Sequence, residues 1–308
     1  MDIVGPSSFL ASVPLFAAVL FLAGGPRCAQ LGQKETASGA AHVLEDVAYA
    51  EADPVQHLDF YVPAAQRFPT VLYVYGSGWH SGMRRSCAPI AAKLQSLGFG
   101  CALIGHRLSP PHVWPAMIED VAAAFAATRR IAGEAGGDPG RIFLVGHSSG
   151  AQLVLLLASD PRWLAANELT PADIAGVVGL SPPVDFAPRG GQGYGDALLG
   201  GHGADVFGRD PVLMRAASPI EHLARTLPPV LLVVGERDFP MLPGDARTYA
   251  ARAKELGLEV PVLEVEGCDH MGTAAGLLDD ESPILERVLG FLEDPRAATR
   301  KGEHGGAK

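Results

Sequence analysis

Short apolar runs alternate with amphipathic segments along most of the chain. Five of the runs are apolar without alternation, as expected for strands of a parallel sheet covered on both faces, at 70–75, 99–105, 141–146, 174–180 and 230–235. Residues 43–50 and 57–62 predict two antiparallel strands at one edge of the sheet. Apolar residues at helical spacing predict helices between the runs, at 118–132, 151–158, 247–256 and 284–292.

This alternation continues over roughly 250 residues, which predicts one α/β domain with a mostly parallel central sheet and helices on both faces. We place the domain at 41–294, with a Gly-rich, irregular, lid-like insertion at about 186–216. Residues 295–308 are charged and aperiodic, and they predict a disordered tail. In such sheets ligands bind beyond the carboxyl ends of the strands.

The N-terminus differs sharply in composition from the rest. Residues 9–23 are almost wholly apolar, a length too short for a comfortable membrane span but suited to a signal peptide. No Lys or Arg precedes the run, so an uncleaved anchor and a misassigned start codon stay open as alternatives. We interpret 1–40 as a signal peptide or N-terminal anchor plus linker, which predicts an exported or membrane-anchored protein rather than a cytoplasmic one.

Composition excludes several classes of partner. The 308 residues include 24 Lys and Arg against 34 Asp and Glu, a net charge of −10 that argues against nucleic-acid binding. The four cysteines have no paired spacing, which argues against a disulfide scaffold and a structural zinc site. The histidines form no H-x-x-x-H pair, and the glycines at 76 and 78 lack a third at 81 for a dinucleotide motif, so we expect neither metal nor cofactor.

The motif that carries chemistry is Gly146-His147-Ser148-Ser149-Gly150, which fits G-x-S-x-G. A predicted buried strand precedes it and a predicted helix follows it, which is the setting of a nucleophile elbow. We therefore expect Ser148 to be a nucleophile, against the alternative of a Gly-Ser turn without chemistry. His147 is expected to pack within the turn.

A serine becomes a good nucleophile only when an oriented base takes its proton. In an elbow-containing fold the acid and then the histidine follow the serine in the chain. Beyond position 225 only His270 and the tail residue His304 remain, and His270 follows a predicted strand at 260–265. Asp238 follows the strand at 230–235 and is the expected acid, with Asp185 and Glu236 as competitors.

Acyl transfer also needs donors directed at the developing oxyanion. The turn at 76–79 follows a predicted strand and can present backbone N–H groups, and the Ser149 N–H is a further donor. The residues that could line the entrance, with plain packing as the alternative for each, are Trp79, His80, Tyr194 and Phe239.

Four segments together resemble the α/β-hydrolase esterases: Y-G-S-G-W (75–79), H-R-L-S-P (106–110), D-P-G-R-I-F-L-V-G-H-S-S-G-A (138–151) and G-E-R-D (235–238). The resemblance is greatest to the hormone-sensitive-lipase-like and acetyl-esterase/feruloyl-esterase-like branches, which also include kynurenine formamidases and isoprenylcysteine methylesterases. It implies that residues 217–219 end the insertion. It also implies a catalytic triad and a set of oxyanion donors, namely Ser148, Asp238 and His270, and Ser77, Gly78 and Ser149.

The chain departs from the family pattern H-G-G-G-W at two positions. Tyr75 replaces the histidine and Ser77 the middle glycine. Serine adopts positive φ less cheaply than glycine, so this departure predicts low turnover or a differently shaped oxyanion hole.

These observations predict a serine carboxylic-ester hydrolase that acts on small to medium acyl esters through an acyl-enzyme. An arylformamidase with the same triad and a catalytically weak binding protein of the hydrolase fold are the alternatives. The expected partner is a small-molecule ester, with possible membrane association only through the N-terminus. The sequence leaves open the oligomeric state and the physiological acyl and alcohol groups.

Overall fold

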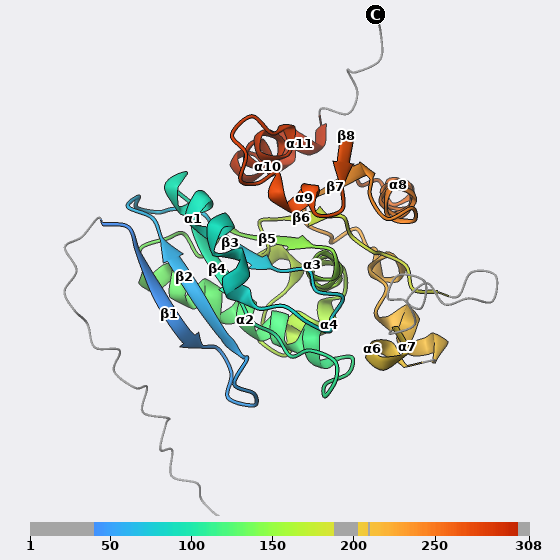
Figure 1. Cartoon of the computed structure of the whole chain (residues 1–308), viewed down its shortest axis with the longest axis horizontal. Helices are drawn as coiled ribbons and strands as arrows, with labels where there is room; N and C mark the ends of the chain where they lie inside the picture. The colour runs from blue at the N-terminus through green and yellow to red at the C-terminus, as the bar shows by residue number, and fades with distance from the viewer. Residues whose placement is uncertain (1–39, 188–202, 209, 301–308) are drawn as a thin grey trace, which may run out of the picture. The chain divides into compact units, whose positions relative to one another are not determined.

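A computed structural model describes residues 40–187, 203–208 and 210–300 of the chain (Figure 1). These residues form an eight-stranded sheet, whose strands are β1 (His42–Ala48), β2 (His57–Val62), β3 (Thr70–Val74), β4 (Gly100–Ile104), β5 (Ile142–His147), β6 (Gly176–Leu180), β7 (Val230–Arg237) and β8 (Val262–Asp269). The spatial order is β1-β2-β4-β3-β5-β6-β7-β8. β2 pairs antiparallel with β1 and β4, and the other five pairings are parallel. The predicted fold class, a mostly parallel α/β sheet with an antiparallel edge, is confirmed.

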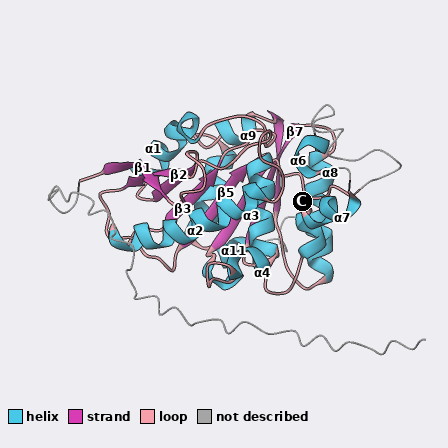
Figure 2. Cartoon of the chain, turned by 90° about the horizontal axis from the view of Figure 1, so that it is seen from below, coloured by secondary structure: helices cyan, strands magenta, loops and turns pink. Residues whose placement is uncertain are grey.

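The helices are α1 (Ala88–Ser96), α2 (Ala116–Glu134), α3 (Ser149–Ser159), α4 (Pro161–Ala165), α6 (Gly203–Phe207), α7 (Pro211–Ala216), α8 (Leu242–Glu255), α9 (Gly272–Ala275), α10 (Pro283–Glu293) and α11 (Pro295–Arg300), with 3₁₀ turns η1 (Arg84–Cys87), η2 (Pro171–Asp173) and η3 (Pro219–His222). Apolar residues of α2, α3 and α8 pack on one face of the sheet, the side seen in Figure 2. Those of α1 and α10 pack on the other.

The centre of the sheet is buried on both faces, as the unbroken apolar runs predict. Every residue of β3, β4, β5 and β6 is buried, and so is every residue of α3. The junction between β5 and α3 is therefore held between the strand and a helix that has no solvent-exposed face. A turn placed there has little freedom to relax.

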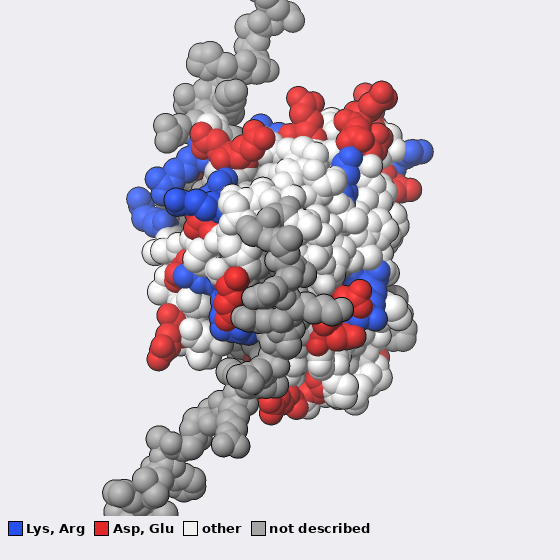
Figure 3. All heavy atoms as spheres, turned by 90° about the vertical axis from the view of Figure 1, so that its left-hand side faces the viewer, with Lys and Arg blue, Asp and Glu red and all other residues white. Residues whose placement is uncertain are grey.

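The antiparallel edge is covered by charge. Glu45 and Asp46 on β1 are exposed, and Arg84 and Arg85 of η1 pair with Asp46. Both arginines also bind the buried Asp59 of β2, at 3.0 and 3.1 Å from their Nε atoms. Figure 3 shows acidic and basic side chains lying side by side on the face at this edge. Charge on an edge strand opposes pairing with another chain, and these ion pairs also attach η1 to the sheet.

The structure describes part of the expected C-terminal tail and almost none of the expected N-terminal segment. Helix α11 occupies Pro295–Arg300, where a disordered tail was expected, because the Asp294 carboxylate accepts the Ala297 N–H at 3.0 Å and starts a new helical turn. Residues 301–308 and residues 1–39, which carry the expected signal peptide or anchor, lie outside the described residues. Of the helices that the structure does describe, none has the length and apolar character to span a membrane.

Candidate active site

The elbow is a strained turn between β5 and α3. Ser148 has φ 52° and ψ −120°, a conformation that a non-glycine residue adopts only when its surroundings require it. The flanking glycines are required by close backbone approach. A Cβ on Gly150 would lie 2.2 Å from the Val74 carbonyl oxygen, and one on Gly146 would lie 2.4 Å from the Gly150 oxygen. The turn thus presents the Ser148 hydroxyl at the carboxyl edge of the sheet.

His270 bridges the serine and a carboxylate. Its Nδ1 lies 2.7 Å from Asp238 Oδ1, and its Nε2 lies 2.9 Å from Ser148 Oγ. Because the carboxylate only accepts, Nδ1–H donates to Asp238 and Nε2 is left to accept the serine hydroxyl proton. The structure therefore brings together the three residues that the sequence singled out, from the ends of β5, β7 and β8.

Asp238 is held in place by further hydrogen bonds. The Ser181 hydroxyl donates to Asp238 Oδ2 at 2.5 Å, and the Phe239 N–H donates to Oδ1 at 2.8 Å. Burial raises the pKa of Asp238, but the hydrogen bonds from His270 and Ser181 outweigh it, and the pKa stays below its ordinary value. Thr273 contacts the Ser181 hydroxyl at 2.8 Å and donates to the His270 carbonyl at 2.9 Å. The carboxylate is thus ionised and rigidly oriented.

The competing acids have other partners. Asp185 accepts a hydrogen bond from the Ala187 N–H at 2.8 Å, and Glu236 accepts one from the Gly267 N–H at 2.7 Å. His270 is bonded to Asp238 instead.

His147 contributes more than turn packing. Its ring lies 4.8 Å from that of His270, and its Nε2 lies 2.9 Å from the His270 carbonyl oxygen. The carbonyl accepts, so Nε2 carries the proton. Burial lowers the pKa of His147 to about 4, so the ring is neutral at physiological pH. His147 therefore supports the loop that carries His270 without adding a second positive charge.

The loop after β3 differs from the expected oxyanion turn. The Ser77 N–H donates to Ser149 Oγ at 2.9 Å, whereas neither the Gly78 N–H nor the Ser149 N–H, the first of α3, has an acceptor among the described residues. The expected strain at Ser77 is wrong, because the positive φ angles fall on Gly78 (59°) and Trp79 (62°). The substitution of serine for the middle glycine therefore costs no left-handed backbone. It adds only a side chain.

The H-R-L-S-P segment supports this loop from behind. The His106 ring stacks on Tyr75 at 4.8 Å, and the Ser109 N–H donates to the Trp79 carbonyl at 2.8 Å. The segment itself is attached to α2 by Asp120, which is buried and accepts from both the backbone and the guanidinium of Arg107, at 2.7 and 2.8 Å.

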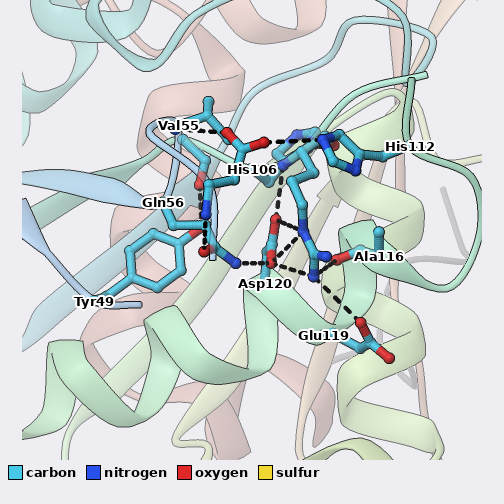
Figure 4. A network of polar contacts seen from close by, with 11 residues as sticks. Tyr49, Val55, Gln56, His106, His112, Ala116, Glu119 and Asp120 are labelled. Atoms are coloured by element: carbon cyan, nitrogen blue, oxygen red, sulfur yellow. Dashed lines mark hydrogen bonds and ion pairs between the residues drawn. The ribbon is translucent and has the colours of Figure 1, made fainter. Parts of the chain in front are cut away.

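Figure 4 shows the wider network around Asp120. Gln56 donates to its Oδ1 at 2.6 Å, and His112 pairs with Asp53 at 2.9 Å close by. Tyr49 adds a hydrogen bond to the Gly105 carbonyl at 2.5 Å. We interpret the network as a support for the loop that follows β3.

A pocket of about 220 Å³ opens in front of Ser148. Phe239 lines it, 46% exposed, with its ring 4.3 Å from that of His270. Trp79 also contributes to the lining, but its indole is fully buried and donates to Gln152 at 3.0 Å. His80 is absent from the lining, and its Nδ1 lies 2.6 Å from the Gly78 carbonyl. Tyr194 lies outside the described residues.

The described part of the 186–216 insertion is packed on the core. Phe207 of α6 contacts the Trp79 ring at 5.0 Å, and the Trp114 N–H donates to the Val206 carbonyl at 2.9 Å. At the base of the insertion, the Phe186 N–H donates to the Ser218 hydroxyl at 2.8 Å, which closes the two ends on each other. Residues 188–202 lie outside the described part.

Sequence reasoning missed Ser181, Thr273 and Gln152. Gln152 is fully buried in α3 and joins the Trp79 indole to the Ala217 carbonyl, at 3.0 and 2.8 Å. A polar residue within an otherwise apolar helix was the available signal for it. For Ser181 the available signal was a polar residue placed directly after a buried strand.

In the part of the chain that the structure describes, no three His, Cys, Asp or Glu residues are grouped to hold a metal ion.

Comparison with known proteins finds relatives that are named as esterases. A family model described as BD-FAE matches residues 58–247. Esterase LipC of Mycobacterium tuberculosis is 30% identical over 231 residues, which cover 71% of this chain and 57% of LipC. Esterase LipQ of the same organism is 28% identical over 251 residues, covering 77% of this chain and 58% of LipQ. The chain thus spans little more than half the length of these relatives.

Solved structures show the same fold. A truncated carbohydrate esterase from gut microbiota has a TM-score of 0.69 at 22% identity, covering 85% of this chain and 99% of its own. A thermophilic esterase from Thermogutta terrifontis has a TM-score of 0.67 at 23% identity, covering 85% of this chain and 95% of its own.

Proposed function

The chain belongs to the BD-FAE family of α/β-hydrolase esterases, and on that premise we propose that it is a serine carboxylic-ester hydrolase working through an acyl-enzyme. The observation that carries the proposal is the bridge from Ser148 Oγ through His270 to Asp238, at 2.9 and 2.7 Å. Nucleophile, base and orienting acid are then within hydrogen-bond reach of one another.

In the first half-reaction Ser148 Oγ bonds to the ester carbonyl carbon while His270 Nε2 takes the hydroxyl proton. The carbonyl oxygen becomes an oxyanion, which the N–H groups of Gly78 and Ser149 are free to stabilise. Ser77 joins them only if its N–H releases Ser149 Oγ. The ester C–O bond then breaks, and the departing alcohol takes the proton from His270.

In the second half-reaction water adds to the acyl-enzyme, and His270 takes a proton from it. The bond to Ser148 Oγ breaks, and the serine recovers the proton as the acid leaves. Asp238 remains ionised throughout, since its hydrogen bonds keep its pKa low, and it stabilises the imidazolium that forms in each half-reaction.

Hydrolysis of p-nitrophenyl acetate and labelling by a fluorophosphonate probe test the proposal together. We expect both with the wild type and neither with Ser148→Ala. Folded wild-type protein that does neither would support the binding-protein alternative. A kcat/KM higher for N-formylkynurenine than for every short ester would support the arylformamidase alternative, which the same triad permits.

We further propose that the protein is exported or anchored through its N-terminus, on the strength of the apolar run at 9–23. Mass analysis of the protein purified from its native source tests this. An intact Met1 in a cytosolic fraction would contradict it.

A further inference from the structure

A second cavity, of about 330 Å³, adjoins the pocket in front of Ser148. The two have three lining residues in common, Gly76, His147 and Met271. From this shared wall the second cavity extends between η1 and the start of α1 on one side and α9 on the other. We call it the α1–α9 cavity, and its characteristic lining residues are Tyr73, Cys87, Ile90, Ala274, Ala275 and Leu278.

The lining of the α1–α9 cavity suits an uncharged, apolar group. It includes no Asp, Glu, Lys or Arg side chain. His147 is neutral above about pH 4, and the Tyr75 ring is stacked on His106. A carboxylate or phosphate would find no cation there and would lose its hydration without compensation.

The pocket at Ser148 and the α1–α9 cavity differ in volume. The pocket at Ser148 measures about 220 Å³, below the roughly 300–1,000 Å³ that small-molecule sites usually occupy. It holds the reacting carbonyl and small groups on either side of it. A longer group needs further space, and the α1–α9 cavity is adjacent to the reacting atoms. Met271 stands at the shared wall with a 65% exposed, unbranched side chain that can move aside.

Both walls of the α1–α9 cavity are preorganised. Arg84 and Arg85 of η1 are attached to the buried Asp59. On the α9 side, Thr273 is buried and donates to the His270 carbonyl at 2.9 Å. A group entering the cavity therefore does not have to order it first.

We propose that the α1–α9 cavity is a substrate subsite that binds an unbranched alkyl group of the ester, reached past Met271 while the carbonyl carbon lies at Ser148. The inference rests on the proposed esterase function and adds the substrate class, medium-chain alkyl esters. The alkyl group belongs either to the acid or to the alcohol part of the ester, and the experiment distinguishes the two.

The first test compares two substrate series. One series is p-nitrophenyl esters from acetate to octanoate, and the other is acetate esters from ethanol to 1-octanol. In the series that uses the cavity, kcat/KM of the wild type should rise about 4-fold for each methylene until the cavity is filled.

Ala275 is exposed at the lining, so Ala275→Phe fills the cavity without disturbing the core. In that series it should lower the ratio of kcat/KM for the longest substrate to kcat/KM for the shortest at least 10-fold. The ratio is octanoate to acetate in the p-nitrophenyl series and octyl acetate to ethyl acetate in the other.

Ala251→Phe is the matched control, because Ala251 is also an exposed helical alanine and lies in neither pocket. It should leave the ratio unchanged. Cys87→Phe fills the cavity from the opposite wall and should repeat the effect of Ala275→Phe, with circular dichroism as the check that both variants are folded. If the chain-length ratio is the same in wild type and both cavity variants, in both series, the inference is wrong even though ester hydrolysis is present.

A second test does not depend on turnover. Cys87 is a free thiol in the lining, and Cys268 is a free thiol outside it. In Ser148→Ala, methyl octanoate or octyl acetate should slow alkylation of Cys87 by N-ethylmaleimide at least 5-fold relative to Cys268, and methyl acetate should not. If Cys87 is alkylated at the same rate without ester, with methyl octanoate and with octyl acetate, the inference is overturned, whether or not the wild type hydrolyses any ester.

Discussion

Replacing His147 by glutamine should remove a large part of the acid sensitivity of the fold. The histidine is 5% exposed, and its Nε2–H donates to the His270 carbonyl. A glutamine amide can still donate to that carbonyl but does not titrate. The comparison of wild type with His147→Gln therefore isolates the protonation of this ring.

The magnitude follows from the pKa of His147, which burial lowers to about 4 from an unfolded value near 6.5. As pH falls, the unfolded chain binds the proton first. The stabilising contribution is therefore complete above about pH 6.5 and is lost progressively down to about pH 4. At pH 5 the loss in free energy of unfolding is about 2 kcal/mol, and at pH 4 about 3 kcal/mol.

Urea unfolding followed by tryptophan fluorescence at pH 8 and pH 5 measures the effect. Wild type should lose about 2 kcal/mol more than His147→Gln between the two pH values. The buried His106, whose pKa burial also lowers, titrates in both proteins and cancels in the difference. Equal losses in the two proteins would refute the reasoning, because they would mean that His147 titrates alike in the folded and unfolded states.

Four further variants test other parts of the site. Asp238→Asn should lower kcat for p-nitrophenyl acetate by about 10⁴-fold, whereas Asp185→Asn should retain it within about 10-fold; the reverse result would move the acid to Asp185. Gly150→Ala places a Cβ 2.2 Å from a backbone oxygen, so it should yield no folded soluble protein on gel filtration. Asp120→Asn leaves Arg107 without its buried anion and should cost about 3–5 kcal/mol of unfolding free energy in urea; a loss below 1 kcal/mol would show that the pair contributes little.

Much of the fold could be read from local pattern. The central strands are apolar on both faces, and that signal needs only consecutive residues. The same holds for the elbow, where Gly146 and Gly150 mark a turn between a strand and a helix. Even the meeting of Ser148, Asp238 and His270 follows from pattern, since each comes after a parallel strand and the carboxyl ends of parallel strands share one edge.

The supporting contacts could not be read in this way. The Ser181 hydroxyl reaches Asp238 across 57 positions of the chain, and His147 reaches the His270 carbonyl across 123. Such contacts depend on strand register and on the paths of loops, which no short stretch of sequence encodes. The strain expected at Ser77 illustrates the difference. The sequence showed which residue had changed, but only the structure showed that Gly78 and Trp79 carry the positive φ angles.

The sequence by itself determined the α/β class, the elbow, and the choice of Ser148, Asp238 and His270. Short-range periodicity and the order of residues along the chain were enough to predict each of them. Only the tertiary structure decided which of the expected oxyanion donors have no acceptor among the described residues, that His147 is a neutral buried support, and that an apolar cavity lies beside the serine. Hydrogen-bond partners, desolvation and cavities arise from atoms that are distant in the chain and close in space.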